Sequence, residues 1–254
     1  MRHYRHRQEL FKNRAQWNKK AVLRLLYYRF YRKIADLLAE PCDFPIIEIG
    51  SGIGKISNII PECLKTDLFP FPGIDLVQNA YQLPFDSESV SNLVLVDVFH
   101  HLKFPGSALK EFDRVLMPGG RVILLEPCLS LLGVMIYGCL HREPLGLSRK
   151  IEWQASSLNQ SVQQGYYAAQ GNAFRVFCMD GYGDRLNDWN IVCREKLSVL
   201  PYIASGGYSR PAFCNVASLK KWDAVDRLLQ KFPFFFATRL FVGIEKRTQK
   251  DTRK

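Results

Sequence analysis

The sequence lacks the cysteine pairs that mark zinc sites and redox centres. Its seven cysteines are scattered between Cys42 and Cys214, and none forms a C-x-x-C pair. A zinc site or a redox dithiol therefore has no support in the sequence, and we expect no resident metal ion. The odd number and the scatter also argue against a disulfide scaffold and fit a reducing, cytoplasmic environment.

Long hydrophobic runs are missing as well. The most apolar segment, CLSLLGVMIYGCL at residues 128–140, is too short to span a bilayer. We expect it to form a buried or interfacial helix. No apolar stretch precedes Ala21, which argues against a signal peptide. The sequence thus predicts a cytoplasmic protein, and peripheral contact with the inner face of an anionic membrane stays open as an alternative.

Residues 1–40 contain neither glycine nor proline, and their apolar residues recur at helical spacing. This stretch holds 11 Lys and Arg against 3 Asp and Glu, so it carries +8 of the net charge of +11. Such a surplus suits a solvated helix face, an anionic membrane, an acidic substrate or nucleic acid. We predict a basic helical segment over residues 1–44 that covers the active site or lies on a membrane.

From Pro45 the pattern changes to short apolar strands that alternate with helical segments. We expect strands at residues 45–49, 63–68, 73–80, 90–98 and 121–127, a helix that starts within residues 53–60, and a helix over residues 106–117. This alternation predicts an α/β fold with a Rossmann-like open sheet. The sheet should be mostly parallel, with an antiparallel final strand and helices on both faces.

The second half of the chain is less regular. We read residues 45–127 as a binding core, residues 128–195 as an insert or lid over the ligand edge, and residues 196–246 as a return to the same sheet. Within that return we expect a strand at 196–203, a helix at 218–232 and the closing strand at 238–246. The paired glycines of YIASGGYSR (202–210) suggest a tight turn that faces the cleft. Residues 247–254 form a basic tail.

The glycine-rich stretch IIEIGSGIGK, residues 46–55, matches neither common phosphate loop. A P-loop needs glycine where Ile49 stands and serine or threonine where Ile56 stands. A dinucleotide fingerprint needs its third glycine where Lys55 stands. The remaining pattern is E-x-G-x-G-x-G, and the carboxylate of Glu48 would repel an anion but attract an ammonium or sulfonium group.

Five motifs in order, spread over residues 45–127, resemble the class I S-adenosylmethionine-dependent methyltransferases, and specifically the small-molecule "methyltransferase type 11" domain. They are EIGSGIG, Asp67 at the end of the second strand, NAYQLPF (79–85), VFHHL (98–102) and LKEFDRVLMPGGRVILLEP (109–127). The resemblance implies S-adenosyl-L-methionine as the cofactor. It departs from the family at Asn79, where aspartate is usual, and in the short FPFPG link (69–73), which replaces a helix and leaves the adenine pocket open or lined by Phe69 and Phe71.

The resemblance also implies roles for single residues. The backbone of the loop Gly50, Ser51, Gly52 and Gly54 would pack against the methionine part of the cofactor, and Glu48 would hold the loop and the amino end. Asp67, followed by Leu68, would take the ribose hydroxyls, and Asn79 with the backbone of Ala80 would read the adenine edge. Asp97 or its backbone would lie near the methionine amine.

His100 and His101 follow the fourth strand, beside the position where the methyl group would point. Histidine titrates near neutrality, so either could act as a general base, or both could simply pack there. The sequence therefore predicts methyl transfer to a small molecule or a lipid-linked glycan. The alternatives are a nucleic-acid methyltransferase, which the absence of an N-P-P-Y-type tetrad disfavours, and a non-catalytic cofactor-binding protein.

Overall fold

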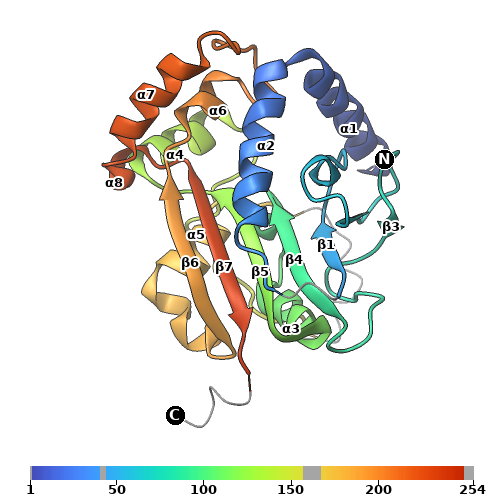
Figure 1. The fold of residues 1–254 in the computed structure, drawn as a ribbon. Coiled ribbons are helices and arrows are strands. Elements are labelled where there is room, and N and C mark those ends of the chain that lie inside the picture. The colour runs from blue at the N-terminus through green and yellow to red at the C-terminus, as the bar shows by residue number, and fades with distance from the viewer. Residues whose placement is uncertain (1, 41–43, 157–166, 249–254) are drawn as a thin grey trace.

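The computed structural model of the chain describes residues 2–40, 44–156 and 167–248. In these ranges, seven strands form one sheet in the order β3-β2-β1-β4-β5-β7-β6. The parallel strands are β3 (Leu76–Val77), β2 (Leu64–Asp67), β1 (Ile46–Ile49), β4 (Val90–Val96) and β5 (Leu116–Pro127). Strand β7 (Arg239–Lys246) is antiparallel to both β5 and β6 (Trp189–Leu197) (Figure 1). The predicted open sheet with an antiparallel final strand is confirmed.

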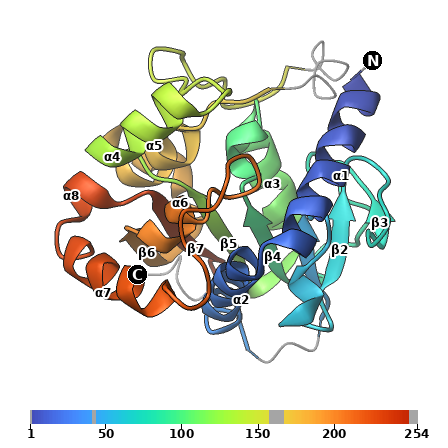
Figure 2. The ribbon, with the colours of Figure 1, turned by 90° about the horizontal axis from the view of Figure 1, so that it is seen from above.

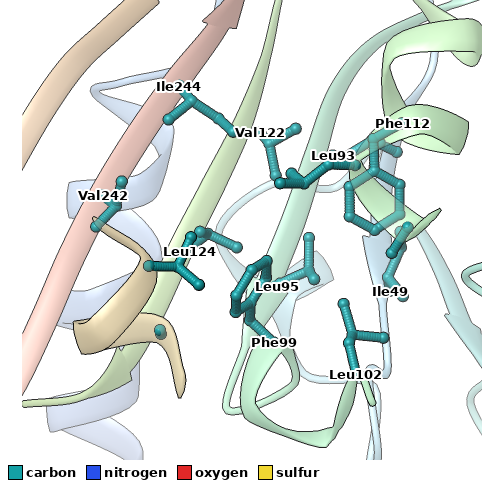
Figure 3. Close-up of a cluster of buried hydrophobic side chains, with 14 of the residues drawn as sticks. Ile49, Leu93, Leu95, Phe99, Leu102, Phe112, Val122, Leu124, Val242 and Ile244 are labelled. Carbon is teal, nitrogen blue, oxygen red and sulfur yellow. The ribbon is translucent and has the colours of Figure 1, made fainter. Parts of the chain in front are cut away.

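The central strands are buried on both faces, as their unbroken apolar runs predicted. Leu93 and Leu95 of β4 point into a cluster with Phe112 and Leu124 (Figure 3). The intervening Val94 points to the opposite cluster. Because side chains alternate along a strand, a run such as LVLV serves two cores at once.

Helices cover both faces of this sheet, as Figures 1 and 2 show. On the face drawn in Figure 3 lie α3 (Pro105–Val115) and α5 (Asn172–Cys178). On the other face, α2 (Ala21–Ala35) packs a stripe of buried residues that recur every three or four positions, which include Leu23, Tyr27 and Ile34. The remaining helices are α4 (Leu131–Met135), the π-helical turn η3 (Ile136–Leu140), η5 (Asp180–Leu186), α6 (Leu200–Ala204), α7 (Leu219–Leu229) and α8 (Pro233–Phe236).

The N-terminal segment is two helices, α1 (Arg2–Lys19) and α2, where the sequence suggested continuous helical periodicity. Lys20 separates them in an extended conformation, at φ −103° and ψ 95°. Its ammonium group donates hydrogen bonds to the carbonyl oxygens of Ser205, Gly207 and Arg210. No glycine or proline marks this break between α1 and α2 in the sequence. The tertiary contact of Lys20 stabilises it instead.

Two other predicted elements are wrong. Residues 53–60 form only the short 3-10 turn η1 (Ile56–Asn58), because Gly54 at φ 61° and Pro61 leave too few residues between them for an α-helix. The expected strand at 196–203 is displaced: β6 spans Trp189–Leu197, inside the predicted insert, and Leu200–Ala204 is helical. Strand β6 lies at the edge of the sheet and exposes Ile191 and Val192, so its burial does not follow a simple alternation.

Among the described residues, no helix is both long enough and apolar enough to cross a membrane.

Candidate active site

The strand order reverses between β1 and β4, and the residues predicted to bind a ligand follow the carboxyl ends of these strands and of β2. The chain runs outward from β1 to β2 and β3 and then returns to place β4 beside β1. In open α/β sheets such a switch point leaves a crevice between the loops on either side. The topology therefore gathers the glycine loop, Asp67 and Asp97 at one edge of the sheet.

Glycine occupies the three positions of the loop for different structural reasons. All have positive φ, which favours glycine. A Cβ on Gly50 would lie 2.5 Å from Val98 Cγ2, and one on Gly54 would lie 2.6 Å from the carbonyl oxygen of Gly73. A Cβ on Gly52 would meet only Leu10 Cδ2, at 3.5 Å. Close packing thus accounts for Gly50 and Gly54, whereas a Cβ at Gly52 would make only an ordinary van der Waals contact with the Leu10 side chain of α1.

Glu48 of β1 lies beneath this loop and is almost fully buried. Burial raises the pKa of its carboxyl group to about 8, with a further contribution from the negative charge of Asp67. Its Oε2 atom has no hydrogen-bond partner among the described residues. A buried carboxylate oxygen without a partner is a place where a bound ammonium group would be stabilised.

Asp67, at the end of β2, is bound to the glycine loop. Its Oδ2 accepts a hydrogen bond from the Gly52 amide at 2.9 Å, and its Oδ1 accepts one from the Phe69 amide at 3.1 Å. These bonds fix the carboxylate beside Gly52. Leu68 follows with an exposed side chain, and Ser51 binds across to β2 through its amide, which donates to the Thr66 carbonyl oxygen at 2.8 Å.

Asn79 and Ala80 lie next to this group along the chain. The amide of the preceding Gln78 donates to the Asp67 carbonyl oxygen at 2.9 Å. The side-chain oxygen of Asn79 accepts a hydrogen bond from the Tyr81 amide at 3.0 Å, which stabilises the turn, and Ala80 is buried in the core.

Helix α1 lies over the same edge of the sheet. His6 Nε2 is 3.8 Å from Asp67 Oδ1, and the His6 ring lies 4.9 Å from the Phe69 ring. A pocket of about 600 Å³ lies between α1 and the link after β2, and it is lined by His6, Arg7, Leu10 and Phe69 to Pro72. The sequence predicted that the basic helices either cover the active site or lie on a membrane. This position of α1 supports the first alternative.

Asp97, which follows β4 at φ 58°, forms an ion pair that the sequence analysis missed. Both of its oxygens accept hydrogen bonds from Arg239, which is buried at the start of β7. Burial would raise the pKa of Asp97, but the Arg239 charge outweighs this effect and lowers it. The sequence signal that could have revealed this ion pair is an arginine at the start of the apolar closing strand. Because β7 is antiparallel, its first residue lies at the ligand edge of the sheet.

Tyrosines surround this ion pair. The Tyr202 ring lies 4.7 Å from the Arg239 guanidinium, and the Tyr27 ring lies 5.4 Å from that of Tyr208. Burial raises the pKa of Tyr27 and Tyr208 well above the usual value, so both hydroxyls are protonated at neutral pH. The predicted turn at 202–210 is present, with Gly206 and Gly207 at positive φ, and Tyr208 packs against Tyr27. Arg210 instead donates to the Leu140 carbonyl oxygen.

His100 and His101 lie in the 3-10 turn η2 (Phe99–His101) beyond β4. His100 Nδ1 is 2.6 Å from Glu126 Oε2, and Glu126 Oε1 also accepts hydrogen bonds from the Val98 and Phe99 amides. Burial lowers the pKa of His100, but Glu126 outweighs it and, with Glu143, raises that pKa to about 10. Burial and the charge of His100 lower the pKa of His101.

Comparison with known proteins agrees with this geometry. Residues 47–124 match the family described as "Methyltransferase domain". No curated protein sequence matches the chain significantly.

Solved structures share the fold. Geranyl diphosphate C-methyltransferase from Streptomyces coelicolor A3(2), solved with Mg²⁺, geranyl diphosphate and S-adenosyl-L-homocysteine, is similar at a TM-score of 0.53 and 13% identity, over 88% of this chain and 81% of that one. The [4+2]-cyclase SpnF is similar at a TM-score of 0.51 and 14% identity, over 87% and 82%. At such identities the likeness concerns the fold alone.

Residues 47–124 therefore carry a methyltransferase domain, as the sequence motifs indicated. The cofactor of this class of domain is S-adenosyl-L-methionine.

Proposed function

We propose that this protein transfers a methyl group from S-adenosyl-L-methionine to a small molecule or a lipid-linked glycan. The observation that carries the proposal is the glycine loop with two carboxyl groups at its edge of the sheet: Glu48, which has an unpartnered oxygen, and Asp67, which is oriented by the Gly52 amide. The residues present fit the cofactor, because a cationic amino acid end and a ribose diol each meet a suitable acceptor.

When bound, the cofactor supplies a sulfonium-activated methyl group. The chain's own residues would bind and orient it: Glu48 at the amino end, the Gly52 backbone along the methionine part, and Asp67 at the ribose. Asn79 and Ala80 would lie at the adenine, and the backbone of Asp97 near the amine, since Arg239 occupies the Asp97 carboxylate. Helix α1 and the tyrosines would exclude water, and in an in-line displacement such positioning and desolvation supply much of the rate acceleration.

An exposed apolar surface on α4 and α8 favours a lipid-linked acceptor. The two helices pack together and expose large apolar side chains, namely Leu131 (58%), Met135 (54%), Phe234 (68%) and Phe235 (47%). We call these four residues the α4–α8 surface. Clustered apolar side chains of this kind mark interaction sites more often than isolated ones do. Among the aromatic residues of the basic helices, Trp17, Tyr27 and Phe30 are buried, and Phe11 is 41% exposed.

Titration calorimetry with S-adenosyl-L-methionine tests the cofactor site. We expect the wild-type protein to bind and the Gly52→Val variant to lose binding, because the valine side chain would clash with a cofactor placed against this loop. Gly119→Val is the matched control: Gly119 also has positive φ, and a Cβ there meets nothing within 4 Å. Equal binding by wild type and Gly52→Val would refute this placement of the cofactor.

A methyl-transfer assay with labelled cofactor then separates the functions. Incorporation into a lipid or small-molecule extract supports the proposal, and incorporation into RNA supports the nucleic-acid alternative. Cofactor binding without transfer to any acceptor class would indicate a cofactor-binding protein, and the similar fold of a cyclase makes this measurement necessary.

A further inference from the structure

Three side chains that are distant in the sequence converge beyond the end of β4. His100 Nε2 lies 3.6 Å from Glu143 Oε2, and His101 Nε2 lies 3.8 Å from Glu143 Oε1. One ligand atom from each of the three residues lies within 4.8 Å of the others. Glu143 comes from the segment after η3, so the insert supplies one member and the sheet edge the other two.

Both imidazole rings are held with Nε2 toward the carboxylate. His100 Nδ1 faces Glu126 Oε2 at 2.6 Å, and His101 Nδ1 faces the Tyr167 carbonyl oxygen at 2.9 Å. A carbonyl or carboxylate oxygen can only accept, so each Nδ1 is the donor and carries the proton. Metal-binding histidines are oriented in this same way, by donating their other ring N–H to a carboxylate or a backbone carbonyl.

The charges of the cluster are consistent with a bound cation. A bound metal ion would displace any proton on Nε2, so each ring would keep its Nδ1 proton and offer Nε2 to the ion. The Gln170 side-chain nitrogen donates a hydrogen bond to Glu143 Oε2, which further orients the carboxylate. The carboxylate would balance part of the charge of the ion.

We propose that His100, His101 and Glu143 bind a divalent transition-metal ion, Zn²⁺ or Fe²⁺ in type. Two imidazole nitrogens and a carboxylate form a ligand set that such ions prefer, whereas Mg²⁺ and Ca²⁺ prefer oxygen. Ligands about 2.0–2.1 Å from a tetrahedral zinc ion are about 3.4 Å apart, close to the separations seen here. His141 Nδ1 lies 3.8 Å from Glu143 Oε2 on the exposed side and stands as a further ligand.

The site lies on the acceptor side of the proposed active site, since η2 directly follows Asp97 and Val98. An ion there would polarise an oxygen atom of the acceptor. This role rests on the proposed methyl transfer, whereas binding of the ion does not, and the two are measured separately. Histidine ligands would also replace the general-base role that the sequence suggested for His100 or His101.

Cobalt titration of the full chain tests the site, with protein that carries no polyhistidine tag and has been treated with a chelator. We expect one Co²⁺ per chain, seen by its visible absorption, with displacement by Zn²⁺ and none by excess Mg²⁺. Glu143→Gln, which keeps the shape of the side chain, and His101→Ala should each weaken Co²⁺ affinity at least tenfold.

His6→Ala is the matched control. His6 Nε2 is also 3.8 Å from a carboxylate, that of Asp67, and its side chain is 33% exposed, the same as that of His101. This variant should retain the cobalt site. Calorimetry with S-adenosyl-L-methionine on Glu143→Gln should show unchanged cofactor binding, so a failure of the metal site is distinguishable from a failure of the cofactor site. Absence of stoichiometric Co²⁺ in the wild type, or equal affinity in Glu143→Gln, would overturn the proposal and leave a proton between His100 and Glu143.

Discussion

At the scale of single residues, the buried carboxyl group of Glu48 costs the fold stability. Its carboxyl group is buried with an oxygen that no described residue satisfies, and its pKa rises from 4.5 to about 8. In the unfolded chain the same group ionises near its ordinary pKa. Between these two pKa values, the folded protein still holds a proton that the unfolded chain has released. The free energy of unfolding therefore falls as the pH rises through this interval.

We predict that Glu48→Gln removes this loss. Between pH 4.5 and 8, the free energy of unfolding of the wild type should fall relative to the variant by about 1.4 kcal/mol for each pH unit. The advantage of the variant in free energy of unfolding should be smallest below pH 4.5 and should level off above pH 8. Urea unfolding of both proteins across this range measures it. A difference that does not change with pH would show that Glu48 ionises normally.

Sequence motifs could name the residues proposed to bind the cofactor because these motifs are local. The acid, the glycines and Asp67 lie near one another in the chain or at the ends of consecutive strands. The partners of His100 and Asp97 escaped prediction for the opposite reason. Glu143 and Arg239 come from distant segments, and their side chains reach the sheet edge only through the path of the insert and the direction of β7.

At the scale of elements, α4 and α8 illustrate how two short helices form a surface that neither defines alone. The apolar run at 128–140 suggested a buried or interfacial helix, and it folds as α4 followed by a π-helical turn. Only one side of it is buried, where the Tyr137 hydroxyl donates to the Thr238 carbonyl oxygen at 2.7 Å. The other side adds to the aromatic residues of α8.

We predict that the α4–α8 surface binds lipid. The double variant Phe234→Ser/Phe235→Ser should sediment with vesicles of phosphatidylglycerol and phosphatidylcholine at least fivefold less than the wild type, because lost apolar burial costs about 25 cal/mol for each Å². Phe213→Ser serves as the control, since Phe213 is 80% exposed elsewhere in the structure. Equal sedimentation of wild type and double variant would exclude this surface as the membrane contact.

At the scale of the whole molecule, the Asp97–Arg239 ion pair joins the end of β4 to the start of β7. The pair links the binding core, which the family match covers, to the C-terminal part of the sheet. Lys20 provides a second link, because its ammonium group binds the carbonyl oxygens of the 205–210 segment. Segments that are distant in the sequence thus enclose the cleft as one unit.

We predict that Asp97→Asn lowers the free energy of unfolding by about 2–3 kcal/mol, because it leaves the buried Arg239 guanidinium without a counter-charge. The partial exposure of Asp97 keeps this figure below that of a fully buried pair. Glu195→Gln is the control, since its salt bridge with Lys33 is exposed and should contribute less than about 1 kcal/mol. Similar losses of unfolding free energy in both variants would show that the Asp97–Arg239 pair contributes no more to stability than an exposed salt bridge.

The sequence by itself determined the open α/β sheet, the class of methyltransferase domain and the cofactor, because strand periodicity and the glycine loop depend on neighbouring residues. Only the tertiary structure decided the break at Lys20, the partner of Asp97, and the convergence of His100, His101 and Glu143. These features depend on contacts between residues far apart in the chain, and no local preference encodes them. The proposed metal site depends wholly on such contacts.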